Sequence, residues 1–373
     1  MINRSNDSIY LKGGLQVRTG LEQLIEGCIL SEDVTSRSRD PIMKKDTILN
    51  QEMIGVLNAF LIKEAAVKPY LSSGEPFQPG YSIQSRQQSP QESFSDCTSD
   101  FRKNAELFHL AFLSWQSGAA VDLPKIREIV LPLAERYKEE PGELLKIPSA
   151  FSSQAYVAQH SLAVSMLSAF IANQLGFPQG EVNQIALAGA LSDCGMAKMT
   201  PAVLQKKLAL TDREFAEIKQ HSIAGYKMIK EISTIKEGVK VGVLQHHERL
   251  DGSGYPLGVK GEQLHPYGKI VAAADTFMAM ICPRPYRSPL SPFKVIEEMK
   301  QDSFGKFDLS TVDVISKMLA RLLRGSHVKL SDGTIGEVIF TDPQHPVRPI
   351  IRTNGKEMVQ LEKRLDLYIE EIL

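Results

Sequence analysis

Hydrophobic positions recur at helical spacing through the middle of the chain, from Asn104 to about Arg324. Apolar side chains three and four residues apart line one face of a helix, and the clearest such face comprises Ile126, Ile129, Val130, Leu133 and Tyr137. One helix is expected from about Ala155 to Leu175. A capping box at Thr211–Glu214 predicts another that begins at Asp212 and carries His221 two to three turns later. The pattern predicts a mainly α protein with an all-helical central domain.

The pattern changes on both sides of this region. Residues 1–72 mix short β-like runs with a helical pattern, which predicts a small N-terminal α/β module. Residues 73–104 lose almost all apolar content and are rich in Ser, Gln, Pro and Gly, which is typical of a flexible linker. After Gly325, two strand–turn–strand patterns predict a small C-terminal antiparallel β domain. The four strands expected there are Val328–Leu330, Ile335–Phe340, Pro349–Arg352 and Met358–Leu361. The full division expected is 1–72, 73–104, a helical connector at 105–150, the helical domain at 151–324 and the β domain at 325–373.

Composition narrows the possible classes of function. The 373 residues include 43 basic and 44 acidic side chains, so a net charge of −1 gives no bulk electrostatic case for a nucleic-acid or membrane partner. Cys28, Cys97, Cys194 and Cys282 form no CxxC pair, which argues against a disulfide framework or a structural zinc site and favours a reducing cytoplasm. The longest apolar stretch, Leu162–Ala172, is too short to span a bilayer, and the N-terminus lacks the apolar core of a signal peptide. A cytoplasmic protein is therefore expected.

The run from His246 to Pro256 carries the strongest chemical signal. It joins two adjacent histidines to two acids and a Gly-rich turn, and both imidazole nitrogens and carboxylate oxygens bind transition metals. His160 and His221 lie in the same helical region. Asp193 and Asp275 end apolar helical runs, where an acid is costly unless it is paired or bound to a metal. Taken singly, His160 and His221 would be packed core histidines, Asp193 a helix cap, and the run from His246 a polar turn with surface histidines. A metal-binding role depends on the motifs that surround these residues.

The order His160, Ser192-Asp193, His221, His246-His247, Asp275 resembles the HD-GYP family of metal-dependent phosphohydrolases, a branch of the HD superfamily. The motifs that carry the resemblance are His160-Ser161, His221 to Gly225, His246 to Pro256, Ala274 to Phe277 and Arg284 to Arg287. The family holds two, sometimes three, metal ions, often iron or manganese, and hydrolyses a phosphodiester, usually in cyclic di-GMP. Paired ions suit that reaction because they stabilise both the attacking and the leaving oxygens.

Carried over to this chain, the resemblance implies a role for each matching residue. The implied metal ligands are His160, Asp193, His221, His246, His247 and Asp275. Asp193 would bridge the two ions, so it is also the implied catalytic residue. The implied substrate-binding residues are Gly254, Tyr255, Pro256, Arg284 and Arg287. The implied cofactor is a divalent transition metal, iron or manganese, and the implied ligand is cyclic di-GMP or a related cyclic dinucleotide.

Three positions depart from the family pattern. Ser192 stands where the family has the histidine of its His-Asp pair, and Met196 stands where it has a lysine. Lys198 follows two residues later but would project in another direction. Tyr156 occupies the position at which members with a third metal carry an acid, so no third ion is expected. One metal loses its imidazole at position 192 while the other keeps its full ligand set, so one site is expected to be better preserved.

Two functions of different classes follow from this pattern. The first is a cyclic di-GMP phosphodiesterase with weak or no hydrolysis. The alternative is a non-catalytic module that binds a cyclic dinucleotide or a protein signalling partner, and a homodimer is also compatible with the sequence. Three further residues have open interpretations: Cys194 as a packed thiol or a substitute ligand, His265 as a surface residue or an extra ligand, and Arg249 as a phosphate contact or a solvated charge.

Overall fold

The computed structural model divides the chain into two compact units, Met1–Ser93 and Phe94–Leu373, each with its own hydrophobic core. The residues that it describes are 17–21, 24–35, 41–50, 53–54, 56–57, 62–72, 77, 97–152, 155–204, 206, 209–283, 288–302, 305–355 and 357–373.

The N-terminal unit contains two small antiparallel sheets. Their strands are β1 (Val17–Gly20) paired with β4 (Glu64–Val67), and β2 (Val34–Thr35) paired with β3 (Pro41–Met43). Residues 53–54 and 56–57 are helical. Leu30, Leu49 and Leu57 are fully buried in its core. Short strands around a few aliphatic side chains agree with the small α/β module expected from the sequence.

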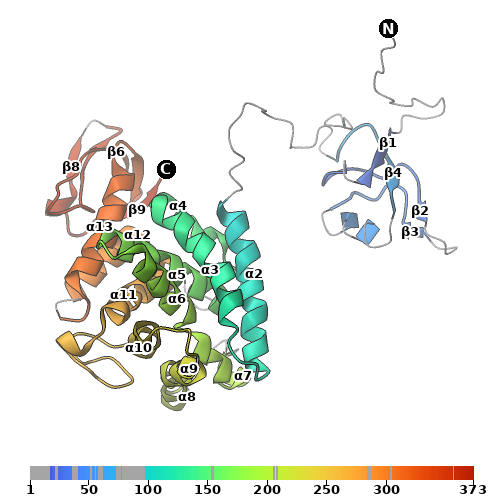
Figure 1. Cartoon of the computed structure of the whole chain (residues 1–373). Coiled ribbons are helices and arrows are strands. Elements are labelled where there is room, and N and C mark those ends of the chain that lie inside the picture. The colour runs from blue at the N-terminus through green and yellow to red at the C-terminus, as the bar shows by residue number, and fades with distance from the viewer. Residues whose placement is uncertain are drawn as a thin grey trace, which may run out of the picture. The chain divides into compact units, whose positions relative to one another are not determined.

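The second unit is mainly helical, as the sequence pattern predicted (Figure 1). Its helices are α2 (Cys97–Gln116), α3 (Leu123–Glu139), α4 (Pro141–Leu144), α5 (Tyr156–Gln174), α6 (Gln179–Leu191), α7 (Pro201–Leu204), α8 (Asp212–Ile218), α9 (His221–Ile229), α10 (Glu237–Gln245), α11 (Pro266–Ile281), α12 (Pro292–Asp302) and α13 (Leu309–Leu323). Short 3₁₀ turns lie between them at η2 (Ile147–Ala150), η3 (Cys194–Lys198), η4 (Gly261–Gln263) and η5 (Leu361–Lys363). None of the described helices is long and apolar enough to cross a membrane.

The start of α2 corrects the predicted linker. Between residues 73 and 96 only Phe77 lies within the described residues, so the linker there is not tested. Residues 97–104, assigned to the linker from their polar composition, belong to α2. Phe101, Ala105 and Phe108 are buried at helical spacing on this helix. The tertiary packing of that face outweighs the polar residues at the start of the helix.

The central helix of this unit is α5. Every residue from Ala158 to Ala172 is buried, because α3, α6 and α11 pack around the helix. A helix enclosed in this way must be apolar on all sides, and the few polar groups must find partners within the core. Ser165, for example, donates from its hydroxyl to the carbonyl of Ala186 at 2.8 Å. This placement carries His160 into the interior of the protein.

The helix expected to run from Asp212 through His221 is interrupted. The capping box at Thr211 forms as predicted, with Glu214 as its partner, but α8 ends at Ile218 and α9 begins at His221. The imidazole of His221 takes the carbonyl of Ile218 as a hydrogen-bond partner at 2.6 Å. A side chain that bonds to a nearby carbonyl in this way offers the backbone an alternative to the helical bond.

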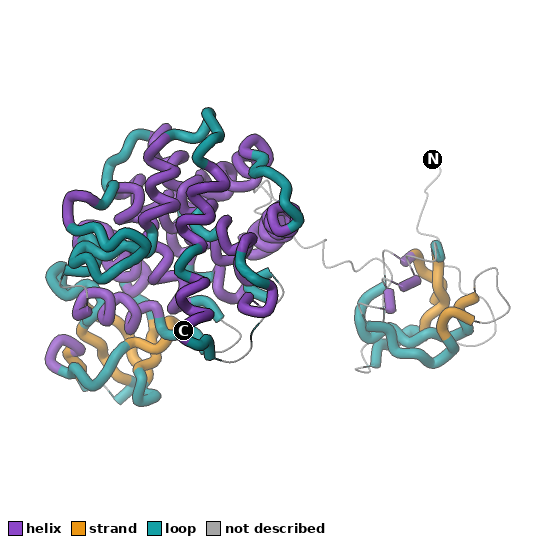
Figure 2. The backbone as a smooth tube through the Cα atoms, turned by 90° about the horizontal axis from the view of Figure 1, so that it is seen from below, coloured by secondary structure: helices purple, strands orange, loops and turns teal. Residues whose placement is uncertain are grey.

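A five-stranded antiparallel sheet closes the chain, with the strand order β8-β7-β6-β5-β9. Its strands are β5 (His327–Leu330), β6 (Ile335–Phe340), β7 (Ile350–Thr353), β8 (Met358–Gln360) and β9 (Ile369–Ile372). The two predicted hairpins are present. β9 was not predicted, because its Ile-Glu-Glu-Ile sequence lacks the alternation of a half-buried strand. The sheet lies at one end of the helices (Figure 2), and its buried residues share one core with them.

An ion pair joins the sheet to α12. Arg348 Nη2 lies 2.7 Å from Glu297 Oε2, and Arg348 Nη1 donates to the carbonyl of Leu361 at 2.8 Å. The two charged side chains are only 11% and 12% exposed. We expect Arg348→Ala to lower the free energy of unfolding by roughly 3 kcal/mol, because it leaves the carboxylate of Glu297 buried without its partner.

Urea unfolding of the full chain measures this effect, and Arg352→Ala is the matched control. Arg352 pairs with Glu337 at 2.5 Å, but these side chains are 52% and 36% exposed. The control should cost under about 1 kcal/mol. Equal losses in the two variants would show that the buried pair does not anchor the sheet.

Candidate metal centre

The six residues predicted as metal ligands converge from different parts of the helical unit. They lie on the mutually packed elements α5, α6–η3, α9, α10 and α11 (Figure 1). His160 is on α5, Asp193 joins α6 to η3, His221 opens α9, His246 and His247 follow α10, and Asp275 is on α11. All are buried except His247, whose side chain is 19% exposed.

Four of these residues form the first cluster: Asp193, His221, His246 and His247. Each offers one ligand atom, and these four atoms all lie within 4.8 Å of one another. The closest approach is 3.1 Å, between His221 Nε2 and His246 Nε2. His221 Nε2 is also 3.4 Å from Asp193 Oδ1. Three imidazoles and one carboxylate are a donor set suited to a divalent transition metal.

Hydrogen bonds fix the tautomers of two of these imidazoles. His221 Nδ1 lies 2.6 Å from the carbonyl of Ile218, and His246 Nδ1 lies 2.7 Å from that of Val243. A carbonyl only accepts, so each Nδ1 carries the hydrogen. The two Nε2 atoms then face each other across 3.1 Å, and in neutral rings both would carry lone pairs. Burial lowers the pKa of His246 to about 4, which favours that neutral form. A proton or a metal ion between these two nitrogens, beside the carboxylate of Asp193, removes their repulsion, so the donor set fits a metal ion.

The second cluster consists of His160, Asp193 and Asp275, whose ligand atoms also lie within 4.8 Å of one another. His160 Nε2 is 2.8 Å from Asp275 Oδ1, and His247 Nδ1 is 3.7 Å from Asp275 Oδ2. Burial acts to raise the pKa of Asp275, but the hydrogen bond from His160 and the nearby histidines outweigh it and hold the pKa below its usual range. Asp193 belongs to both clusters, so its carboxyl group lies where it could bridge two ions.

Ser192 does not replace the histidine expected at its position. Its side chain is fully buried, and its hydroxyl donates to the carbonyl of Gly189 at 2.8 Å. Met196 packs against the hydrophobic core, and Lys198 donates to the carbonyl of Trp115 at 2.7 Å. Cys194 is a buried thiol that belongs to neither cluster of potential ligands, and burial raises its pKa to about 12. These side chains therefore contact backbone carbonyls or the hydrophobic core.

Two glycines allow Asp193 and His221 to approach each other. A Cβ atom on Gly195 would lie 1.9 Å from the carbonyl oxygen of His221 and 2.4 Å from the nitrogen of Gly225. The backbone of η3 can therefore pack this closely on α9 because Gly195 has no side chain and faces another glycine, Gly225. The glycine one turn after His221 has a physical purpose, which is to bring the backbone that carries Asp193 against this helix.

The loop that carries Gly254-Tyr255-Pro256 is held by Glu248, a residue for which no role was predicted. Glu248 is fully buried, and its Oε1 accepts hydrogen bonds from the backbone of Leu257 at 2.6 Å and Gly258 at 3.1 Å. In the sequence, the position of Glu248 directly after the two histidines was the only feature that could have indicated this role. Among the described residues, its Oε2 has no hydrogen-bond partner.

The same loop folds back onto His247. A Cβ atom on Gly254 would lie 2.5 Å from His247 O, Glu248 Cα and Arg249 N, so only glycine fits there. The Tyr255–Pro256 peptide bond is cis. The Tyr255 ring lies 4.6 Å from the His247 ring, between centroids. Burial, followed by the charges of Asp275 and Asp193, raises the pKa of Tyr255, so its hydroxyl stays protonated beside the clusters.

We expect Glu248→Ala to loosen this loop. The change removes two hydrogen bonds to a carboxylate, each worth roughly 1.5–3 kcal/mol. Hydrogen exchange of the Leu257 and Gly258 amides should accelerate, whereas in Glu262→Ala, an exposed acid of η4, it should stay at the wild-type rate. Unchanged exchange in Glu248→Ala would mean that the loop is held by other contacts.

The remaining predicted contacts have different outcomes. Arg249 is partly buried: it donates to the carbonyl of Glu248 at 2.8 Å and lies 4.6 Å over the Phe307 ring, and its role as a phosphate contact or a solvated charge stays open. His265 is not an extra ligand but the N-cap of α11, where its Nδ1 accepts from the backbone nitrogen of Tyr267. Arg284 and Arg287 lie outside the described residues.

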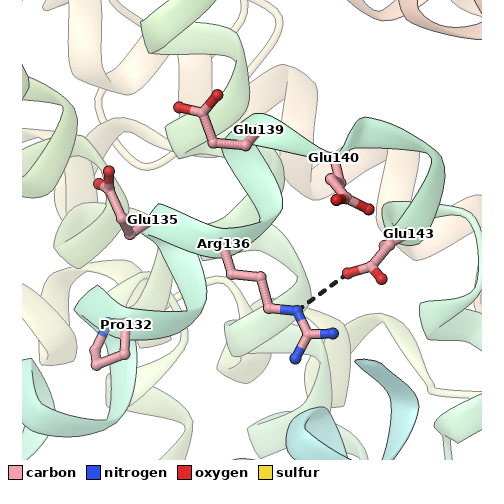
Figure 3. Close-up of a pocket in the computed structure, with 6 residues that line it drawn as sticks. All are labelled: Pro132, Glu135, Arg136, Glu139, Glu140 and Glu143. Atoms are coloured by element: carbon pink, nitrogen blue, oxygen red, sulfur yellow. Dashed lines mark hydrogen bonds and ion pairs between the residues drawn. The ribbon is translucent and has the colours of Figure 1, made fainter. Parts of the chain in front are cut away.

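A surface pocket lies on α3 and α4, away from the predicted residues (Figure 3). Its lining consists of Pro132, Glu135, Arg136, Glu139, Glu140 and Glu143. Arg136 Nε pairs with Glu143 Oε2 at 3.2 Å. None of the implied metal ligands or substrate-binding residues lines it, so the chemistry of the buried clusters is separate from this pocket.

Comparisons with known proteins agree with the geometry. Residues 144–310 match the family model of the HD domain. The cyclic di-GMP phosphodiesterase PA4108 of Pseudomonas aeruginosa is 30% identical over 228 residues, covering 61% of this chain and 55% of that protein. A cyclic di-GMP phosphodiesterase of Thermotoga maritima is 33% identical over 216 residues, covering 57% and 58%. The 3'3'-cGAMP-specific phosphodiesterase 1 of Vibrio cholerae is 33% identical over 164 residues, covering 43% and 37%. The chain thus spans little more than half the length of the first two relatives.

Proposed function

We propose that this chain is an HD-GYP-type protein that binds one divalent metal ion tightly and recognises a cyclic dinucleotide beside it, because residues 144–310 match the HD domain model and the relatives are cyclic di-GMP phosphodiesterases. We further propose that it hydrolyses that ligand at least about 100-fold more slowly than an intact relative. The ligand class comes from the relatives, which act on cyclic di-GMP or on 3'3'-cGAMP.

The observation that carries the metal proposal is the facing of two imidazole lone pairs. His221 Nε2 and His246 Nε2 lie 3.1 Å apart, and each ring already donates its Nδ1 hydrogen to a carbonyl. Neither Nε2 can donate to the other while the rings are neutral. A divalent cation would relieve this repulsion, and His221, His246, His247 and Asp193 would be the residues that hold it. Iron or manganese suits this mixture of nitrogen and oxygen ligands.

The low turnover follows from the second cluster. It offers only His160, Asp193 and Asp275, because the hydroxyl of Ser192 is bonded to its own helix. Loss of a partner that merely orients a ligand costs about 10 to 100-fold in metal affinity or activity, and here a ligand itself is absent. Met196 also stands where the family pattern has a lysine, so a positive charge is absent, and losing one such electrostatic donor costs on the order of 100 to 1000-fold in rate.

The protein residues divide the remaining tasks. A divalent ion held in the first cluster would acidify a water molecule and neutralise phosphate oxygens. Asp193 would contribute its carboxylate to the first cluster while it also lies within reach of His160 and Asp275 in the second. Tyr255 covers His247 and presents a protonated hydroxyl near the clusters, and Glu248 holds the loop that carries it.

The alternative proposal is a binding module without turnover. One contrast favours it. Glu248 accepts two backbone hydrogen bonds from the segment that follows Gly-Tyr-Pro, whereas the second cluster has only three potential metal ligands. In that case the chain would respond to a cyclic dinucleotide, or to a protein partner, through the loop alone.

A direct comparison tests the proposal. The full chain is purified under anaerobic conditions, loaded with iron or manganese, and assayed for cyclic di-GMP binding and for linear dinucleotide. We expect binding with turnover at least about 100-fold below that of an intact relative measured in parallel. Turnover equal to that relative would contradict the impaired site. Absence of both binding and turnover would contradict recognition of a cyclic dinucleotide.

A further inference from the structure

Lys219 lies at the edge of the metal centre without an assigned role. It caps the end of α8, two residues before His221, and its side chain is half-buried. Its Nζ lies 5.5 Å from the centroid of the Tyr255 ring and 4.7 Å from that of Phe215. Tyr255 in turn contacts the His247 ring. The ammonium group is therefore one aromatic ring away from a predicted metal ligand.

The surroundings of this charge favour an anion as its partner. Within the part of the chain that the structure describes, no carboxylate lies within 4.0 Å of Lys219 Nζ. By contrast, Lys206, Lys230 and Lys240 of neighbouring segments are each paired with a glutamate. A cation that rests on aromatic faces keeps its hydrogen-bond donors available.

Phe215 adds a second recognition element. Its side chain is 47% exposed although it belongs to α8, and the Lys219 ammonium rests on its ring. An exposed aromatic ring next to an unpaired cation matches the two parts of a nucleotide, because a base stacks on the ring and a phosphate pairs with the charge.

We propose that Lys219 binds a phosphate of the cyclic dinucleotide and that Phe215 stacks on one of its bases. The proposal rests on the proposed function, because it assigns residues for the same ligand. Lys219 would supply from α8 the positive charge that Met196 no longer supplies from η3. Substrate recognition would then survive although the family lysine is absent.

Binding of cyclic di-GMP to the full chain at two salt concentrations tests this assignment. Lys219→Met should weaken binding about tenfold or more and flatten its salt dependence, because a charge-assisted bond to phosphate is lost. Lys219→Arg should restore most of the affinity. Phe215→Ala should weaken binding about tenfold with the salt dependence unchanged. Lys227→Met, which removes an exposed charge from α9, is the control and should bind as the wild type does.

Metal content per chain, measured on every variant, separates a local effect from misfolding and should stay at the wild-type value. If the wild type binds cyclic di-GMP and Lys219→Met binds within twofold of it, the assignment of Lys219 is wrong while the proposed function stands. If the wild type itself binds no cyclic dinucleotide, the proposed function fails and this assignment fails with it.

Discussion

His246→Ala is expected to lower the affinity of the chain for its metal ion by more than about 100-fold. Removing a residue that only supports a ligand costs about 10 to 100-fold, and His246 is itself one of the four proposed ligands in the first cluster. Its Nε2 lies 3.1 Å from His221 Nε2, so its loss also opens the gap that a cation would fill. Titration of the metal-free protein with manganese under anaerobic conditions measures the change.

The control for this prediction is His265→Asn. His265 lies in the same region of the chain, but it caps α11 and belongs to neither cluster. Asparagine also caps helices, so the fold should be preserved. We expect wild-type manganese affinity in this variant. Equal losses in the two variants, or full affinity in His246→Ala, would show that the first cluster is not the metal site.

The second large effect is a gain. The double variant Ser192→His with Met196→Lys is expected to bind a second metal ion per chain and to hydrolyse cyclic di-GMP at least about 100-fold faster than the wild type. Position 192 immediately precedes Asp193, so an imidazole there would join His160, Asp193 and Asp275 as a fourth ligand. The lysine would restore the charge that stabilises a phosphoryl transition state.

Ser192→Ala is the matched control for the gain. It removes the hydroxyl that donates to Gly189 without adding a ligand, so it should retain the wild-type metal content and turnover. No increase in metal content in the double variant, with its helical content intact, would mean that the second cluster has diverged at further positions.

Much of the site could be predicted, because several of its residues are of types that are costly to bury without a partner. The six implied ligands stand in motifs that resemble those of the HD-GYP family, and Asp193 and Asp275 also end apolar runs, where an acid is costly without a partner or a metal. The structure brings all six into two overlapping clusters. The helical periodicity likewise predicted α5, because a buried helix is apolar throughout.

The parts that sequence reasoning missed depend on tertiary contacts. Glu248 holds the Gly-Tyr-Pro loop through backbone groups nine and ten residues away, and no pattern of residue types encodes that pairing. The contacts of Arg249 with the Phe307 ring and the Thr276 hydroxyl were likewise not predicted. The break between α8 and α9 arises because His221 bonds to the carbonyl of Ile218. Each of these depends on distances that only the folded chain sets.

The first cluster has four potential ligands and the second has three, so the number of metal ions bound per chain tests the account most directly. Anaerobic loading of the wild-type protein with manganese, followed by elemental analysis and electron paramagnetic resonance, measures both the number and the coupling of the ions. We expect one ion per chain with the spectrum of an isolated Mn(II), abolished in His246→Ala. Two ions per chain with a spin-coupled spectrum would contradict an impaired second site, and no bound ion would contradict the metal centre itself.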